Sequence, residues 1–391
     1  MNVRETEDAC LVPSYVKLPL TVVRGEDVWV WDENGDKYLD LYSGHAVCGI
    51  GHSHPKLVKA ISEQAGKLIF FSNAVYNDTR AAAAKLLIDS AYPGSKTVFF
   101  VNSGTEANEV ALKIARRATG RPRVIAMENG FHGRTIGSLS VTGNQKLRDD
   151  FPENLSHLTD FVPIGDFDTL EALMGEDVAA IILEPVTSVG GVRIAARKYY
   201  DSLRELCLGY GTALIFDEVQ TGFGRTGEMF AGMHWGLEPD IVTCAKGAGG
   251  GFPMGCVILN EAISSAPAPH EHGCTFGGGP LAMAALKANL EILKEQDLAR
   301  NAREMEIIVR DILGAIPEIL AITGKGLLLG LELECPAKPI VQGLLSRKII
   351  VGGCDRPGMI RLLPPLTVKE EHIKMLAGAL QEALAVAKQG V

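Results

Sequence analysis

Two short apolar segments of this 391-residue sequence end in side chains of opposite charge. Asp217 closes the segment 213–216 (ALIF), and Lys246 follows the segment 241–244 (IVTC). Both segments have the length and composition of buried parallel strands. Ligands of open α/β sheets bind beyond the carboxyl ends of the strands, so we expect both charged groups to face one crevice.

A carboxylate and an amine that face the same crevice suit pyridoxal phosphate. Its ring nitrogen stays protonated against a carboxylate, and its aldehyde forms an imine with a lysine amine. Each feature alone has an ordinary explanation, because Asp often ends a strand and a Lys beside glycines is usually solvated. The interpretation therefore depends on a further feature, a site for the phosphate.

A candidate phosphate site lies at residues 102–109 (NSGTEANE), between a predicted buried strand at 97–101 and a predicted helix that extends to Arg117. Backbone N–H groups at a helix N-terminus, together with the hydroxyls of Ser103 and Thr105, bind phosphate well. The segment is not a Walker A loop, because no Gly-Lys-Ser/Thr follows. In the alternative reading, Ser103 or Thr105 only caps the helix.

Two other stretches contain residues that could do chemistry. In the turn 129–135 (NGFHGRT), Phe131 can stack on a planar ring and Arg134 can pair with a carboxylate. The histidines His45, His52 and His54 raise the question of a metal. Their spacing matches no helical ligand pair and Pro55 follows directly, so we expect a loop and a helix start, and no metal site.

The elements around these residues alternate between strands and helices. Strands are predicted at 123–127, 178–183 and 256–259, and helices at about 79–89 and 198–209. This βαβα order predicts an α/β fold with a mostly parallel sheet and helices on both faces. The segments 28–31 and 38–41 flank an Asn-Gly turn, which predicts a hairpin. We expect an N-terminal segment (1–45) that packs with the small domain, a large domain that holds the cofactor (46–280) and a small C-terminal domain (281–391) that begins with a connecting helix.

Composition excludes several classes of function. The net charge is −9 with no long basic block, which argues against nucleic acid as a partner. The eight cysteines form no CxxC pair, so neither a zinc site nor a disulfide framework is expected, and their use fits a reducing compartment. The N-terminus is too polar for a signal peptide, and no apolar run approaches the roughly 18 residues of a membrane span. We expect a cytoplasmic protein.

Taken together, the motifs resemble the class III (ornithine-type) aminotransferases of fold type I, and are most like their acetylornithine aminotransferase branch. The resemblance extends from about residue 20 to about residue 380. It rests on five stretches: 51–55 (GHSHP), 102–108 (NSGTEAN), 131–134 (FHGR), 217–227 (DEVQTGFGRTG) and 245–255 (AKGAGGGFPMG). It implies a seven-stranded sheet in the large domain, pyridoxal phosphate as cofactor, and a homodimer whose active sites are shared between subunits.

The resemblance also implies a reaction and a role for each site residue. The amino donor would be N-acetylornithine or a related acylated or ω-amino substrate, as in arginine biosynthesis, and 2-oxoglutarate would be the acceptor in a ping-pong mechanism. Lys246 would hold the cofactor and move the proton, while Asp217 would keep the ring nitrogen protonated. The remaining cofactor contacts would come from Phe131, His132 and Val219 around the ring, Gln220 at its phenolic oxygen, Ser103, Gly104 and Thr105 at the phosphate, and Thr275 of the neighbouring subunit. Arg134 and Arg361 would bind substrate carboxylates.

The sequence departs from this family at one informative position. Residues 184–191 read EPVTSVGG, where the family usually has EPIQGEGG. The second Glu of the family pattern pairs with the arginine at the Arg361 position while an ω-amino donor binds. Val189 stands there in this chain, so that gate cannot operate, and we expect Arg361 to be available to an acid and the substrate range to be narrower.

Other functions on the same scaffold are kept as alternatives. They are the other class III ω-amino acid aminotransferases, which use 4-aminobutyrate, ornithine or β-alanine, a decarboxylating relative, and glutamate-1-semialdehyde aminomutase. The segment from Gln220 to Gly227 disfavours the aminomutase. A protein that binds the cofactor without catalysis is a further alternative, disfavoured because Lys246, Asp217 and the phosphate segment are intact.

Overall fold

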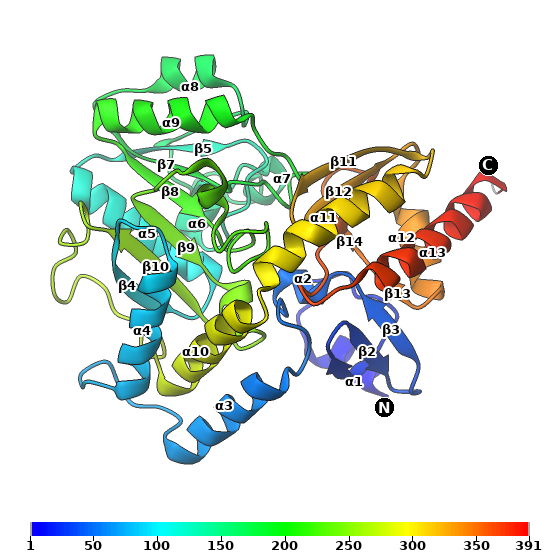
Figure 1. Cartoon of the computed structure of the whole chain (residues 1–391). Helices are drawn as coiled ribbons and strands as arrows, with labels where there is room; N and C mark the ends of the chain where they lie inside the picture. The colour runs from blue at the N-terminus through cyan, green and yellow to red at the C-terminus, as the bar shows by residue number, and fades with distance from the viewer. Residues whose placement is uncertain (1, 390–391) are drawn as a thin grey trace.

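The computed structural model describes residues 2–389 and is organised around a seven-stranded sheet (Figure 1). Across the sheet, the strands are β4 (Ser95–Val101), β10 (Gly255–Asn260), β9 (Ile241–Cys244), β8 (Ala213–Asp217), β7 (Val178–Leu183), β5 (Arg123–Met127) and β6 (Thr159–Val162). The pairs from β9 to β6 are parallel, while β10 is antiparallel to both of its neighbours. The predicted α/β fold with a mostly parallel sheet is confirmed. The short connection between β9 and β10 has no room for a crossover helix, which explains the reversal of β10.

Helices cover both faces of this sheet because its strands are buried on both sides. Alternate residues of β5 enter different clusters: Val124 and Ala126 pack with α5 (Gly104–Thr119), and Ile125 packs with α9 (Arg197–Tyr210). This division follows from the two-residue period of a strand. Beyond the β4 edge, α10 (Pro280–Glu295) packs against α3 (Pro55–Lys67) and α4 (Asp78–Ser90).

The first 300 residues also contain shorter helices and turns. They are α1 (Val3–Cys10), α2 (Ser43–Ala46), α6 (Ile136–Ser140), α7 (Gln145–Arg148), α8 (Phe167–Leu173) and the 3₁₀ turns η1 (Ala231–Trp235) and η2 (Lys246–Gly249). Within the described part of the chain, no helix is both long enough and apolar enough to cross a membrane. Residues 1 and 390–391, at the ends of the first and last predicted domains, lie outside the described residues.

Two smaller sheets lie beside the central one, in the right half of Figure 1. One is antiparallel and contains β11 (Ile319–Lys325), β12 (Leu328–Leu333), β15 (Met359–Leu362) and β14 (Gly352–Gly353). The other contains β1 (Val22–Glu26), β2 (Trp29–Asp32), β3 (Lys37–Asp40) and β13 (Ile349–Ile350). The predicted hairpin is β2–β3, and β13 pairs with β3 in parallel, so N-terminal and C-terminal segments share this sheet. The helices of this region are α11 (Leu298–Gly314), α12 (Ala337–Ser346) and α13 (Glu370–Gln389).

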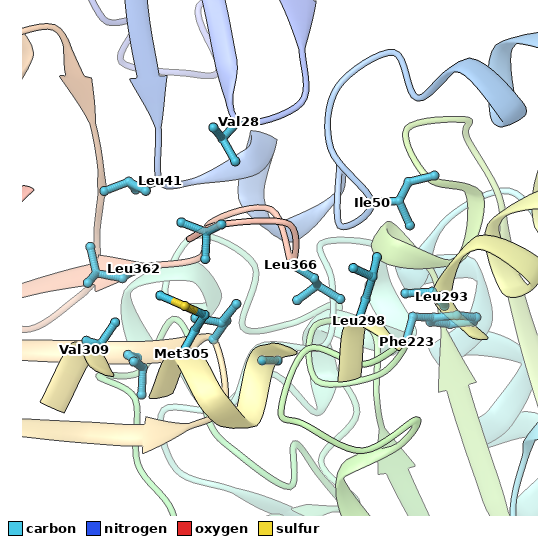
Figure 2. Packing of buried hydrophobic residues seen from close by; sticks show 14 of the residues in the cluster. Val28, Leu41, Ile50, Phe223, Leu293, Leu298, Met305, Val309, Leu362 and Leu366 are labelled. Atoms are coloured by element: carbon cyan, nitrogen blue, oxygen red, sulfur yellow. The ribbon is translucent and has the colours of Figure 1, made fainter. Parts of the chain in front are cut away.

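One apolar cluster joins these parts (Figure 2). It contains residues from every part of the chain: Val28 from the N-terminal strands, Phe223 from the loop after β8, Leu298 from the start of α11, and Leu362 and Leu366 from the C-terminal region. Close packing of this kind resists relative movement of the elements it joins. The loop after β8, which begins at Asp217, is thereby held against the C-terminal part of the chain.

Candidate active site

A cavity of about 640 Å³ opens where β8 and β9 end and α5 begins. Its wall contains every site residue predicted from the sequence except Thr275: Ser103, Gly104, Thr105, Phe131, His132, Arg134, Asp217, Val219, Gln220, Lys246 and Arg361. It also contains residues that the sequence did not single out as functional, among them Tyr15, Asn108, Glu184 and Met254. Most of the predicted site residues therefore lie around one space.

Asp217 and Lys246 converge because β8 and β9 are parallel neighbours. Asp217 is the last residue of β8 and is paired in register with Thr243 of β9, and Lys246 begins η2 just beyond β9. Lys246 has φ +35°, which is unusual for a residue with a Cβ. Backbone strain of this kind concentrates at functional sites, where the surrounding structure holds it in place.

The Asp217 carboxylate is 3% exposed and satisfied by three donors. His132 Nδ1 lies 2.7 Å and Asn108 Nδ2 2.8 Å from Asp217 Oδ2, and the Val219 N–H donates to Oδ1 at 3.0 Å. Burial alone would raise the pKa of Asp217, but these hydrogen bonds outweigh it and lower the pKa below its ordinary value. The carboxylate therefore stays ionised although it is buried, and it can pair with a cation in the cavity.

Asn108 is held in turn by Thr243, whose hydroxyl donates to Asn108 Oδ1 at 2.7 Å. Asn108 has no signal in the sequence beyond a polar residue on the buried side of the predicted helix. His132 carries its proton on Nδ1 if it donates to Asp217, and its Nε2 is buried without a hydrogen-bond partner among the described residues.

The N-terminus of α5 supplies the features of an anion site. Ser103 is the N-cap and accepts from the Glu106 N–H at 3.3 Å, so the capping alternative also holds. The preceding N–H groups of Gly104 and Thr105 find no acceptor within residues 2–389. A Cβ on Gly104 would come within 2.9 Å of Val219, so glycine is required for this close approach. Two free N–H groups at a helix start suit a phosphate.

Glu184 and Lys246 are titratable groups that line the cavity. Glu184 is buried and accepts from the N–H groups of Phe131 (3.0 Å) and Ser188 (3.3 Å). Burial, together with the nearby charge of Asp217, raises the pKa of Glu184 to about 7. Burial also lowers the pKa of Lys246, despite the opposing attraction of Asp217 and Glu184. A lysine amine with a lowered pKa is a usable base nearer to neutral pH.

The two predicted arginines have different settings. Arg134 is exposed at the edge of the cavity, with its guanidinium 5.9 Å from the centre of the Phe131 ring. Arg361 is 4% exposed and donates to Gly353 O (2.6 Å), Ser188 Oγ (3.0 Å) and Tyr42 Oη (2.6 Å). All three acceptors are uncharged. Val189, which stands where the family usually has Glu, follows Ser188 directly, and the Ser188 hydroxyl contacts Arg361.

Thr275 is not part of this cavity. It is exposed and lines a separate hollow with Asn73, Arg80, Phe100 and Cys274. This chain alone therefore does not bring Thr275 to the helix start at Ser103.

The three histidines considered for a metal have separate partners. His45 contacts Tyr42, His52 Nε2 lies 2.7 Å from Asp40 Oδ2, and His54 accepts from the N–H of Lys56 at the start of α3. The predicted helix start at Pro55 is confirmed. Burial would lower the pKa of His52, but the hydrogen bond with Asp40 raises it to about 10.

The family model described as aminotransferase class-III matches residues 11–384. Acetylornithine aminotransferase of Methanosarcina mazei is 41% identical, over 98% of this chain and 96% of the relative. The [LysW]-aminoadipate semialdehyde transaminase of Deinococcus radiodurans is 40% identical, over 95% of this chain and 87% of the relative. A crystal structure of the ornithine aminotransferase from Toxoplasma gondii superimposes with a TM-score of 0.93 and 30% identity, covering 99% of this chain and 95% of that one.

Proposed function

This chain belongs to the class III aminotransferases, and we propose that it uses pyridoxal phosphate to move the ω-amino group of N-acetylornithine, or of a related acylated ω-amino substrate, to 2-oxoglutarate. The observation that carries the proposal is the joint placement of Lys246, the buried Asp217 carboxylate and the free N–H groups of α5 around one cavity. These groups fit the amine, anion and phosphate-binding roles that the cofactor requires.

When bound, the cofactor supplies the carbonyl that takes the amino group and the ring that stabilises a carbanion. Asp217, held by His132 and Asn108, would keep a proton on the ring nitrogen. The Gly104 and Thr105 N–H groups would bind the phosphate, while Phe131, Val219 and Gln220 would orient the ring. Lys246 Nζ would take the proton from the amine-bearing carbon of the substrate and pass it to the cofactor within the same half-reaction, and it would carry a proton in the opposite direction in the second half-reaction.

The acceptor is assigned from the charges of the cavity. Arg134 and Arg361 place two guanidinium groups on its wall, and a guanidinium matches a carboxylate in charge and shape. A dicarboxylate such as 2-oxoglutarate can use both. Because donor and acceptor would occupy the same cavity in turn, we propose a ping-pong order.

We also propose that the active unit is a homodimer in which Thr275 of one subunit completes the phosphate site of the other. Phe276, which follows Thr275 in the chain, is 66% exposed, and its ring contacts that of Phe70, whose neighbours Phe71 (52%) and Ile69 (61%) are also exposed. A second copy of the chain would cover them.

The donor is the part of the proposal that needs a direct comparison. Relatives named acetylornithine aminotransferase and [LysW]-aminoadipate semialdehyde transaminase are almost equally similar to this chain, so the second donor type is kept as a candidate. Production of glutamate from 2-oxoglutarate should be measured with N-acetylornithine, ornithine, 4-aminobutyrate and β-alanine, each against Lys246→Ala. Turnover with N-acetylornithine that is abolished by Lys246→Ala supports the proposal. Turnover only with the unacylated donors would refute the donor assignment, and no turnover with any donor would refute the function.

A further inference from the structure

Within the described part of the chain, the side chain of Arg361 hydrogen-bonds only to uncharged groups. A guanidinium carries five N–H groups. Three of them donate to Gly353 O, Ser188 Oγ and Tyr42 Oη. The other two, one on each terminal nitrogen, have no acceptor among the described residues, and Arg361 lines the cavity. A guanidinium with free N–H groups can hydrogen-bond a carboxylate.

We propose that Tyr42 and Ser188 are positioning residues that keep Arg361 permanently in place to bind a carboxylate on the amine-bearing carbon of the substrate, and that His45 adds a third donor to the same carboxylate. The inference rests on the proposed aminotransferase function. It goes beyond that function, and beyond the carboxylate-binding role that the family resemblance implies for Arg361, by assigning Tyr42, Ser188 and His45 to substrate recognition.

The role of His45 follows from the order of protons in a short relay. Tyr42 Oη accepts from Arg361 Nη2 at 2.6 Å, and it lies 2.9 Å from His45 Nδ1. A tyrosine hydroxyl has one proton, which is then directed to His45 Nδ1, so this ring nitrogen accepts. The proton of the neutral imidazole therefore sits on Nε2. His45 lines the cavity, so its Nε2–H is a donor for a bound ligand.

The backbone that carries His45 is strained. Ser43, Gly44, His45 and Ala46 have φ values of +44°, +59°, +65° and +64°, which is a left-handed turn. Residues with a Cβ avoid this conformation, and it persists where the surrounding structure imposes it, often at functional sites.

The contacts that impose the turn also connect it to Arg361. Asp40 Oδ1 accepts from the N–H groups of Tyr42 and Ser43, both at 2.9 Å, and the charged His52 holds the other carboxylate oxygen. The Ser43 hydroxyl donates to Leu363 O at 2.6 Å, next to the strand that carries Arg361. The turn and the arginine are thus fixed to each other.

The arrangement selects a substrate class. No acidic side chain of residues 2–389 pairs with Arg361, so its site favours molecules that bring a carboxylate to the reacting carbon, as glutamate and 2-oxoglutarate do. The amine-bearing carbon of an ω-amino donor carries a hydrogen atom where that of glutamate carries a carboxylate. Arg361, Tyr42 and His45 therefore do not strengthen the binding of an ω-amino donor. Loss of the Tyr42 hydroxyl should therefore weaken the binding of ligands with a carboxylate on the reacting carbon and leave the binding of ω-amino donors unchanged.

The test compares Tyr42→Phe with Tyr38→Phe in the cofactor-loaded enzyme. Tyr38 is a buried tyrosine of the same N-terminal region, with its hydroxyl near Lys348 (3.1 Å) and away from the cavity. We expect Tyr42→Phe to weaken binding of glutarate, measured by calorimetry, and to lower kcat/KM for glutamate, each by about 10-fold. The kcat/KM for an ω-amino donor should change less than about 2-fold, and Tyr38→Phe should change none of these values. Equal losses for both donor types, or unchanged glutarate binding, would overturn the proposal.

A second variant isolates His45. Asparagine tolerates left-handed backbone and lacks the distal N–H, so His45→Asn keeps the turn and removes the third donor. We expect the same selective loss for glutamate, and a double variant with Tyr42→Phe that is little worse than either single variant. Additive losses would contradict the relay. If glutarate binding shifts as expected but no donor reacts, the proposed function fails while the positioning role stands.

Discussion

Glu184, the buried acid near Asp217, should make the stability of the protein depend on pH. Burial raises its pKa from 4.5 to about 7. A raised pKa means that the folded protein holds the proton more tightly than the unfolded chain does. Below about pH 4.5 the group is protonated in both states and has no effect. Between about pH 4.5 and about pH 7 the unfolded chain releases this proton while the folded protein still holds it, so the free energy of unfolding falls over this range and levels off above about pH 7.

The size of the effect follows from the shift. The difference of about 7 minus 4.5 is about 2.5 pKa units, which at 1.36 kcal/mol per unit gives about 3 kcal/mol. About 2.5 kcal/mol of this falls between pH 5 and pH 8. Glu184→Gln removes the ionisation. Gln cannot accept from both N–H groups that Glu184 satisfies, which adds a cost of about 1–2 kcal/mol that does not depend on pH.

The assay is urea-induced unfolding of the cofactor-free enzyme between pH 5 and pH 8, for the wild type and Glu184→Gln. All other titrating groups are common to both proteins, so the difference between their unfolding free energies isolates Glu184. We expect the variant to gain about 2.5 kcal/mol relative to the wild type as the pH rises from 5 to 8. A difference that stays constant over this range would refute the reasoning.

Three further variants test individual parts of the site. His132→Phe removes a hydrogen bond to the buried Asp217 carboxylate, so the dissociation constant of pyridoxal phosphate should rise about 10-fold or more in a fluorescence titration; unchanged affinity would contradict the role of His132. Val189→Glu places an acid beside Arg361, so the ratio of kcat/KM for glutamate to that for an ω-amino donor should fall about 10-fold, and an unchanged ratio would exclude this account of the missing gate. Thr275→Ala should weaken cofactor binding about 10-fold in a protein that sediments as a dimer, whereas full affinity would exclude Thr275 from the phosphate site.

The sequence predicted the central sheet well because buried parallel strands are short, apolar and bounded by polar residues. The strands at 123–127 and 178–183 have the predicted bounds, and the predicted family is confirmed by relatives across the whole chain. The charged residues at the ends of β8 and β9 could be placed at one edge because parallel strands end at the same edge. The residues of β10 do not indicate that this strand runs antiparallel to its neighbours.

Partners from distant segments could not be predicted. Asn108 is 109 positions from Asp217, and Tyr42 is 319 positions from Arg361. Such pairs depend on how whole elements pack, and a polar residue in a helix or a loop is compatible with many partners. The left-handed turn at His45 was expected only as a loop, because three of its four residues have no intrinsic preference for that conformation.

The central claim is that one cavity carries an amino group from a donor to a 2-oxo acid on pyridoxal phosphate. The most direct test follows the visible absorption of the cofactor-loaded enzyme while N-acetylornithine is added without an acceptor, and then while 2-oxoglutarate is added. We predict conversion of the bound cofactor to pyridoxamine phosphate, with one equivalent per subunit, followed by full recovery and release of glutamate. A spectrum that no amino donor changes, in a protein that holds the cofactor through Lys246, would contradict the claim.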